Sequence, residues 1–359
     1  MGNDPTDAAP RRGYTLVLSG GGLKGLAHIG VFRALTERGL PPYTVVGSSM
    51  GSLIAASWAN GNSIREMEDR ALALRRSDVF RIAHVDMALR RMLSPALYRR
   101  DPLDRILNEL LGSRTFQDLT HRLIVNTVDL NSGNQILWGL PGLDDVLVAD
   151  AVFASCALPG ILPPRRIRGH LCADGAVIEN LPVRTAAAIG GGPIVAVDLG
   201  GGRTPRHGIE RTGFAATYSR GLELVMGRLV EHSLRFWKGP PLVLIRPQVK
   251  LVSMFAFNRT PFLIAEGYRA TIEALDRLHA PLFELENGIH PRFSISLRVD
   301  RHQCIGCGVC AAVRPHLFRM TDGKAEPVVA SQPWDPVSDV IERMCPVGAI
   351  RTEVLDGSV

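Results

Sequence analysis

The segment from Tyr14 to Asn60 runs twice from a short apolar stretch through a glycine-rich loop into a helical stretch. Residues 14–18 are apolar and lead into Gly20-Gly21-Gly22, and residues 43–46 are apolar and lead into Gly47-Ser48-Ser49-Met50-Gly51. Short apolar runs that alternate with helix-period stretches predict buried parallel strands joined by crossover helices. We therefore expect an α/β fold whose two glycine loops lie side by side at the carboxyl ends of neighbouring strands.

The first glycine loop has two interpretations. Gly20, Gly22 and Gly25 fit G-x-G-x-x-G, which is the fingerprint of a dinucleotide site when it follows a strand. Such a site also needs Asp or Glu near the end of the second strand, about 20 residues on, to bind the ribose hydroxyls. The chain has the glycine- and serine-rich loop 47–51 there instead. We therefore interpret Gly20, Gly21 and Gly22 as backbone N–H donors to an oxyanion.

The second glycine loop has the pattern G-x-S-x-G, with Ser49 at its centre. A serine on a sharp turn from strand to helix projects its hydroxyl above the sheet, and glycines two residues away on either side tolerate the crowding. Ser49 is therefore the candidate nucleophile. An α/β-hydrolase would add an acidic residue and then a histidine, but nothing around the downstream histidines singles one out as a base, so we interpret each as a surface or a structural histidine. They include His207, His232 and His279.

Four motifs together resemble a bacterial patatin-like phospholipase. They are Gly20-Gly21-Gly22-Leu23-Lys24-Gly25, Gly47-x-Ser49-x-Gly51, Ala154 to Gly160 (ASCALPG), and Asp174-Gly175-Ala176 with Asn180-Leu181-Pro182. The resemblance implies a three-layer α/β/α hydrolase with a mostly parallel sheet, acting on lipid acyl esters. It also implies a Ser–Asp dyad, with Ser49 as nucleophile and Asp174 as general base, and an oxyanion hole at Gly20, Gly21 and Gly22. A carboxylate is a useful base near neutral pH only if burial raises its pKa.

Four of the six cysteines lie between Cys304 and Cys345. Cys304, Cys307 and Cys310 form C-x2-C-x2-C, and Cys345-Pro346 follows; zinc sites more often use two separated pairs, so the spacing favours an iron–sulfur cluster. Residues 294–352 resemble a single-cluster bacterial ferredoxin, which implies a small α+β domain. Three-iron relatives lack the second cysteine of this pattern, whereas Cys307 is present here. We therefore expect these four cysteines to bind a [4Fe–4S] cluster. The other two, Cys156 and Cys172, are interpreted as small buried hydrophobic residues.

The length of 359 residues allows two or three domains. We expect a disordered leader at 1–12, a patatin-like hydrolase domain at 13–280, a linker at 281–293 that contains Pro281, Gly288 and Pro291, and a ferredoxin-like domain at 294–359.

The net charge of +6 is modest, and we expect no nucleic-acid partner. No apolar run approaches the ~18 residues of a spanning helix, so we do not expect an integral membrane protein. Arg11-Arg12 resembles a twin-arginine signal, but cleavage after it would remove the expected first strand and glycine loop, so we expect a cytoplasmic protein. Residues 75–100 combine seven arginines with two aspartates and interleaved apolar residues. Such a stretch suits peripheral contact with an anionic membrane, at the inner face of the cell membrane; the alternative is an arginine-rich helix that covers the domain's own core.

The sequence thus predicts a serine esterase of the phospholipase or lysophospholipase type. Ester hydrolysis moves no electrons, so the iron–sulfur module would serve electron transfer to a redox partner, redox regulation of the hydrolase, or structure. The alternative is a ferredoxin-type electron-transfer protein whose hydrolase-like half is a non-catalytic binding scaffold.

Overall fold

The structure is a computed structural model of the 359-residue chain. It describes residues 13–79, 96–190, 192–200, 208–209, 213–249, 251–253, 256–334, 342 and 344–355. The expected leader, residues 1–12, and residues 80–95 of the basic stretch lie outside the described residues.

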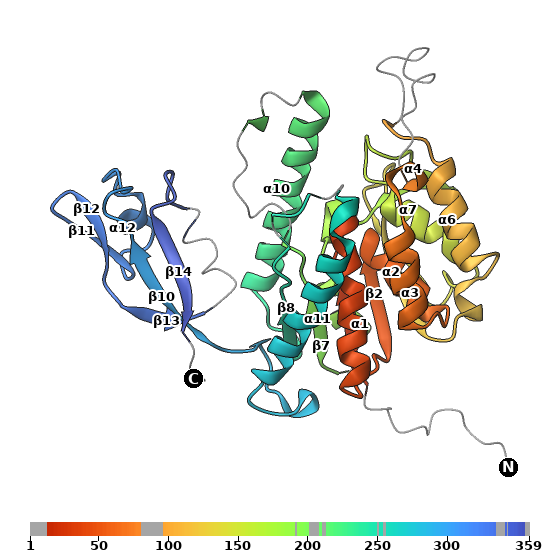
Figure 1. The fold of residues 1–359 in the computed structure, drawn as a ribbon, viewed down its shortest axis with the longest axis horizontal. Coiled ribbons are helices and arrows are strands. Elements are labelled where there is room, and N and C mark those ends of the chain that lie inside the picture. The colour runs from red at the N-terminus through yellow and green to blue at the C-terminus, as the bar shows by residue number, and fades with distance from the viewer. Residues whose placement is uncertain are drawn as a thin grey trace.

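A nine-stranded sheet dominates the described part of the chain (Figure 1), with the order β5-β6-β3-β2-β1-β7-β8-β9 and β4 paired to β3. The central strands β3, β2, β1, β7 and β8 run parallel, as does β9, whereas β4, β5 and β6 are antiparallel to their neighbours. The strands are β1 (Thr15–Leu18), β2 (Thr44–Ser48), β3 (Arg122–Asp129), β4 (Gln135–Trp138), β5 (Arg165–Ile167), β6 (His170–Asp174), β7 (Ile194–Val197), β8 (Leu242–Ile245) and β9 (Ile289–His290).

Helices cover both faces of this sheet, which confirms the three-layer α/β/α architecture. Alternate residues of β1 enter different cores: Leu16 and Leu18 join one apolar cluster and Val17 joins the other. The first cluster contains residues of α1 (Ala27–Glu37), α2 (Met50–Ala59), α3 (Ile64–Ala73), α6 (Asp101–Leu111), α7 (Val148–Cys156) and α11 (Thr260–Asp276). The second contains residues of α9 (Val183–Ile189) and α10 (Phe214–Arg235). Short helices are α4 (Arg76–Val79), α8 (Ala176–Glu179), and the 3-10 turns η1 (Gly22–Leu26), η3 (Phe116–Asp118), η5 (Phe257–Arg259) and η6 (Leu282–Glu284).

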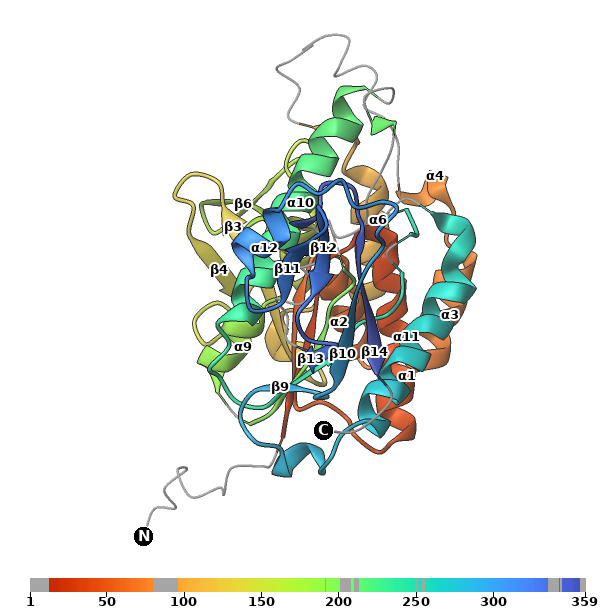
Figure 2. The ribbon, with the colours of Figure 1, turned by 90° about the vertical axis from the view of Figure 1, so that its left-hand side faces the viewer.

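The C-terminal part forms a small separate α+β module with its own apolar core, as expected. One sheet has the order β13-β10-β14 and a second pairs β11 with β12. The elements are β10 (Ser294–Val299), α12 (Val309–Val313), β11 (Phe318–Thr321), β12 (Lys324–Pro327), β13 (Ser331–Pro333) and β14 (Ile350–Leu355). Figures 1 and 2 show this module, in blue, on the side of the nine-stranded sheet that carries α10 and β8.

The segment 281–293, expected to be a linker, continues the fold of the nine-stranded sheet. Leu282 and Leu285 are buried in its larger core, and β9 pairs with β8. The two leucines are spaced three residues apart across a 3-10 turn, a pattern too short to be distinguished from a loop in the sequence. The sheet therefore extends to His290, directly before the module. Within the described ranges, no helix combines the length and apolar character that crossing a membrane requires.

Candidate active site and cysteine site

Ser49 lies on a sharp turn between β2 and α2. Its φ of 53° and ψ of −130° are strained for a residue with a side chain. The flanking glycines have no room for a Cβ: one on Gly47 would lie 2.5 Å from the Cα of Ser52, and one on Gly51 would lie 2.4 Å from the carbonyl oxygen of Leu18. The G-x-S-x-G pattern thus has the steric basis that the sequence suggested.

Two consecutive buried hydrogen bonds support this turn. The Ser49 backbone N–H donates to the Ser155 hydroxyl at 2.9 Å, and that hydroxyl donates to the Asn126 carbonyl oxygen at 2.7 Å. Ser155 and Asn126 are both fully buried. The Ser52 hydroxyl donates to the Ser49 carbonyl at 2.6 Å. The sequence had singled out the block 154–160 without giving Ser155 a role, because a bond to Ser49, 106 residues away, leaves no local pattern.

Asp174 ends β6 and is buried. Its carboxylate accepts hydrogen bonds from the Ala176 N–H at 2.9 Å and from the Ser49 side chain. Burial raises the pKa of Asp174 to about 7, although both hydrogen bonds favour the charged form and oppose the rise. The structure therefore brings Ser49 and Asp174 together and gives the carboxyl a pKa in the range of a general base at neutral pH.

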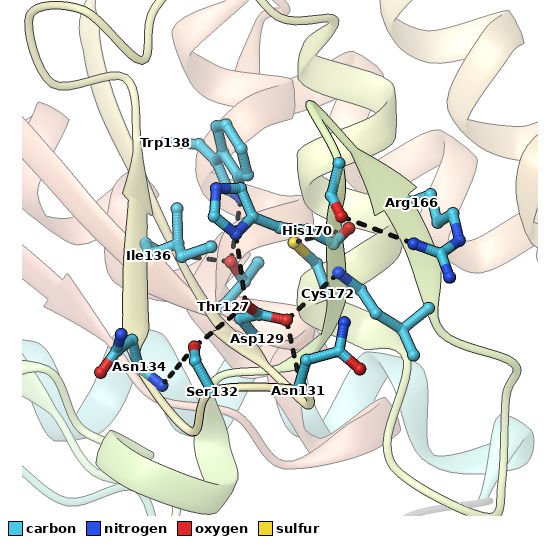
Figure 3. Close-up of polar contacts among 12 residues, drawn as sticks. Thr127, Asp129, Asn131, Ser132, Asn134, Ile136, Trp138, Arg166, His170 and Cys172 are labelled. Carbon is cyan, nitrogen blue, oxygen red and sulfur yellow. Dashed lines mark hydrogen bonds and ion pairs between the residues drawn. The ribbon is translucent and has the colours of Figure 1, made fainter.

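The strand that carries Asp174 is held in register by Asp129 (Figure 3). Asp129 is the last residue of β3 and pairs with Cys172, two residues before Asp174. Its carboxylate accepts from the backbone N–H of Leu171 at 3.2 Å and lies 3.2 Å from Nδ1 of His170, so it ties β6 to β3. It also accepts from the Asn131 N–H at 3.1 Å and the Ser132 hydroxyl at 3.0 Å, which closes the turn toward β4. These bonds hold the pKa of Asp129 below its ordinary value, the Asn131 bond contributing most.

The glycine loop lies beside the serine turn, because β1 and β2 are parallel neighbours with Leu18 opposite Gly47. This confirms the expected juxtaposition of the two loops. A Cβ on Gly20 would lie 2.9 Å from the Cβ of Ser49, so the loop backbone closely approaches the candidate nucleophile. The Gly20 N–H, however, donates to the Asn180 carbonyl oxygen at 3.2 Å. Gly20 is therefore engaged within the protein, and Gly21 and Gly22 are the better candidates for donors to an oxyanion.

A cavity of about 120 Å³ opens between the two loops. Ser49, Asp174, Asn180 and all three loop glycines line it. The rest of its wall is largely apolar, from Met50, Leu53, Val79, Leu103, Leu158, Ile161, Leu162, Leu199 and Met226. Such a wall suits an acyl chain next to a small set of polar groups.

In the part of the chain that the structure describes, no histidine lines this cavity. His28 is buried with Nε2 2.9 Å from the Ser19 carbonyl oxygen, and burial lowers its pKa to about 4. His232 and His279 are exposed, and His207 lies outside the described residues. Cys172 is buried in the core as expected, whereas Cys156 is only half-buried and lines the cavity.

The four cysteines expected to bind a cluster line one small pocket of the C-terminal module: Cys304, Cys307, Cys310 and Cys345. None of them forms a disulfide. Among the described residues, no three metal-ligand side chains are close enough to hold a single ion; a [4Fe–4S] cluster instead takes one thiolate at each of four irons.

The surroundings of these thiols suit a cluster. The Ala349 N–H donates to the sulfur of Cys345 at 3.2 Å. Backbone N–H groups of Ala325 and Gly306 bond to Cys304 and lower its pKa. Backbone donors of this kind stabilise thiolate ligands, so the donor set fits an iron–sulfur cluster.

Four arginines of the basic stretch are in the described part of the chain and are exposed: Arg75, Arg76, Arg99 and Arg100. Arg99 pairs with Asp101 at 3.2 Å and Arg100 with Asp104 at 3.8 Å.

Comparison with known proteins gives a match for each part of the chain. Residues 16–187 match the family described as patatin-like phospholipase, and residues 299–352 match the 4Fe-4S single cluster domain of Ferredoxin I. An uncharacterized NTE family protein of Mycobacterium tuberculosis is 29% identical over 194 residues, which are 54% of this chain and 50% of that protein. Lysophospholipase NTE1 of Coccidioides immitis is 28% identical over 284 residues, 73% of this chain and 18% of that protein.

The chain thus spans half the length of these curated relatives or less. Among solved structures, VipD from Legionella pneumophila matches with a TM-score of 0.41 and 17% identity, covering 74% of this chain and 67% of that one.

Proposed function

Because the chain joins a patatin-like phospholipase domain to a 4Fe-4S single-cluster ferredoxin domain, we propose that it hydrolyses acyl esters of lipids with Ser49 and Asp174 as a catalytic dyad. The observation that carries this proposal is the buried Asp174 carboxyl, which bonds to the Ser49 side chain and has a pKa of about 7. A base with this pKa is half ionised near neutral pH and can accept the serine proton.

In the proposed reaction the Ser49 oxygen attacks the ester carbonyl carbon, and its proton passes to Asp174. The carbonyl oxygen becomes an oxyanion that accepts hydrogen bonds from the N–H groups of Gly21 and Gly22, each such donor being worth about 3–4 kcal/mol in the transition state. The C–O bond breaks, and the alcohol leaves with the proton from Asp174. Water, deprotonated by the same carboxylate, then cleaves the acyl-enzyme to release a fatty acid.

The cavity wall supports a lipid as the acyl donor. Its apolar side chains from α2, α6 and α10, such as Leu53, Leu103 and Met226, would surround the first carbons of an acyl chain. The fungal relative is named a lysophospholipase, so lysophospholipids are the first substrates to test.

The test is removal of each dyad member from the full-length protein. Ser49→Ala and Asp174→Asn should each lower the hydrolysis of a p-nitrophenyl ester by at least about a thousandfold. Ser49→Ala should also abolish fluorophosphonate labelling. Ser48→Ala is the matched control, because Ser48 is the neighbouring, fully buried serine, and it should keep the label. Full activity in a folded Asp174→Asn variant would exclude the dyad, and a folded wild-type protein that neither labels nor hydrolyses would favour the scaffold alternative.

For the C-terminal module we propose that Cys304, Cys307, Cys310 and Cys345 bind a [4Fe–4S] cluster, with residues 294–359 as the domain that surrounds it. When bound, the cluster supplies a one-electron redox centre, which ester hydrolysis itself does not need. Its candidate roles are redox regulation of the hydrolase, electron transfer to a partner, and structural support. Esterase rates measured in oxidised and reduced protein test the first role: a difference supports regulation, and equal rates exclude it.

We also propose that the hydrolase contacts anionic membranes peripherally. The support is the exposed arginines at both described ends of the basic stretch. Flotation with vesicles that contain anionic lipid should carry the protein, and flotation with neutral vesicles should not. Absence from both fractions would remove this proposal.

A further inference from the structure

Trp334 connects the two cores of the molecule. It directly follows β13 of the C-terminal module. Its backbone N–H donates to the Phe293 carbonyl oxygen at 2.7 Å, and the two rings stack with centroids 4.8 Å apart. The same side chain packs against the apolar cluster of the module and against the second cluster of the hydrolase sheet. Figure 1 shows the module on the β8 side of that sheet.

On the hydrolase side, Trp334 meets Arg246, whose guanidinium carbon lies 5.2 Å from the ring centroid. This is within the ~6 Å range of a cation–π contact. Arg246 follows β8 and forms an ion pair with Asp198, with Nε 3.3 Å from Oδ2. The Asp198 side chain is almost fully buried and that of Arg246 largely so. The indole therefore covers a buried ion pair, and a pair of this kind depends on staying dry and well oriented.

Asp198 is in turn connected to the glycine loop. It follows β7, accepts from the Gly200 N–H at 2.9 Å, and precedes Leu199. The Leu199 N–H donates to the Ser19 hydroxyl at 3.2 Å, and a Cβ on Gly21 would lie 3.0 Å from the Leu199 side chain. Leu199 also lines the cavity beside Ser49. A shift of the Asp198 turn would therefore move the surface against which the glycine loop packs.

We propose that Asp198 and Arg246 are positioning residues for the glycine loop, and that the C-terminal module holds them in place through Trp334. This inference rests on the proposed function only where it concerns turnover. The contact between Trp334 and Arg246 does not depend on turnover. Through it the C-terminal module supports the glycine loop that carries the candidate oxyanion donors, whether its cysteines are oxidised or reduced.

The experiment uses full-length protein and two readouts. Amide hydrogen exchange is measured for peptides that cover residues 19–25 and 198–200, and ester hydrolysis is measured as kcat and KM. Trp334→Ala and Arg246→Lys should each speed exchange in both peptides at least threefold and lower kcat several-fold with little change in KM. Trp334→Phe keeps an aromatic face, so its exchange rates and its kcat should be close to those of the native protein. Val328→Ala, an exposed change elsewhere in the module, should alter neither.

The double variant provides the decisive comparison. If Trp334 and Arg246 act through the same chain of contacts, the double variant Trp334→Ala/Arg246→Lys should change the exchange rates and kcat no more than the stronger single variant does. Additive effects, or unchanged exchange at residues 19–25 in Trp334→Ala, would overturn the proposal. Because exchange needs no substrate, a protein without esterase activity would refute the proposed function and still report on this coupling.

Discussion

The backbone N–H of Ser49 donates to the hydroxyl of Ser155, and this bond holds a serine whose φ is positive. The partner is on α7, which is 106 residues away from Ser49 along the chain. Strained backbone at a reactive residue persists only when its neighbours over-determine the conformation. Ser155 therefore supports the candidate nucleophile through the main-chain N–H of Ser49, and not through the Ser49 hydroxyl.

Ser155→Ala should lower kcat about 10- to 100-fold with little effect on KM, because a small displacement of the nucleophile is costly in the transition state. It should also cost about 1–3 kcal/mol of unfolding free energy, since the Ser49 N–H and the Asn126 carbonyl lose their buried partner. Steady-state kinetics and urea denaturation measure the two effects. Ser57→Ala, which removes a different buried hydroxyl of α2, should cost stability alone. Equal losses of kcat in both variants would contradict the assignment.

The pKa of Asp174, raised to about 7 by burial, predicts the pH profile of the proposed esterase activity. The carboxyl is a base only when it is ionised, so kcat/KM should fall below pH 7 and approach a tenfold loss per pH unit. Above pH 8 this group should have no further effect. The profile is measured with a substrate that does not titrate in this range. A plateau that extends to pH 5 would show that the catalytic base has an ordinary carboxyl pKa.

The same burial predicts that Asp174→Asn stabilises the protein at neutral pH. The pKa rises from its ordinary value of 3.8 in the unfolded chain to about 7 in the folded protein. The folded state therefore binds more protons between pH 4 and 7, so the unfolding free energy of the native protein falls as pH rises through this window. Asn does not titrate, so the advantage of the variant should grow from pH 4 to pH 7, by a few kcal/mol at most. Denaturant unfolding of the native protein and the variant is measured at pH 4.5 and pH 8. The same difference in unfolding free energy at both pH values would contradict the prediction.

Two glycine-to-alanine changes should have opposite effects on stability. A Cβ on Gly51 would meet backbone at 2.4 Å, whereas Gly221 in α10 has open space around it. Gly51→Ala should therefore lower the unfolding free energy by about 1–3 kcal/mol and impair activity. Gly221→Ala should raise it by about 0.5–1 kcal/mol, because alanine favours a helix interior. The midpoints of urea denaturation compare the two, and a Gly51→Ala variant as stable as the native protein would contradict the steric argument.

Much of the hydrolase fold could be predicted from the sequence, because its central strands are short apolar runs next to tight loops. The apolar runs 123–128, 135–138 and 193–197 are typical of strands, and they form β3, β4 and β7. Ser63 followed by Glu66 is the pattern of a capping box, which is present at the start of α3. The helix-period stretch 23–38 predicts one helix, but it begins as a 3-10 turn, η1, which gives way to α1 at Ala27.

Long-range partners explain what the sequence could not predict. The engagement of the Gly20 N–H by Asn180 joins loops 160 residues apart, and no local pattern marks it. The edge strand β9 has only two residues, so its identity depends on its pairing with β8. The support that Ser155 gives to Ser49, and the contact of Trp334 with Arg246, likewise exist only once the chain is folded.

The position of Trp334 has a consequence for how this protein can be divided. A hydrolase fragment cut after His290 would keep every strand of its large sheet, yet it would lose the indole that lies over Arg246. Water would then reach a carboxylate and a guanidinium that the intact chain keeps covered. A chimaeric protein with a different C-terminal domain should therefore keep an aromatic side chain over Arg246. Trp334 belongs to the C-terminal domain in the sequence, but its ring forms part of the structure on the other side of the boundary.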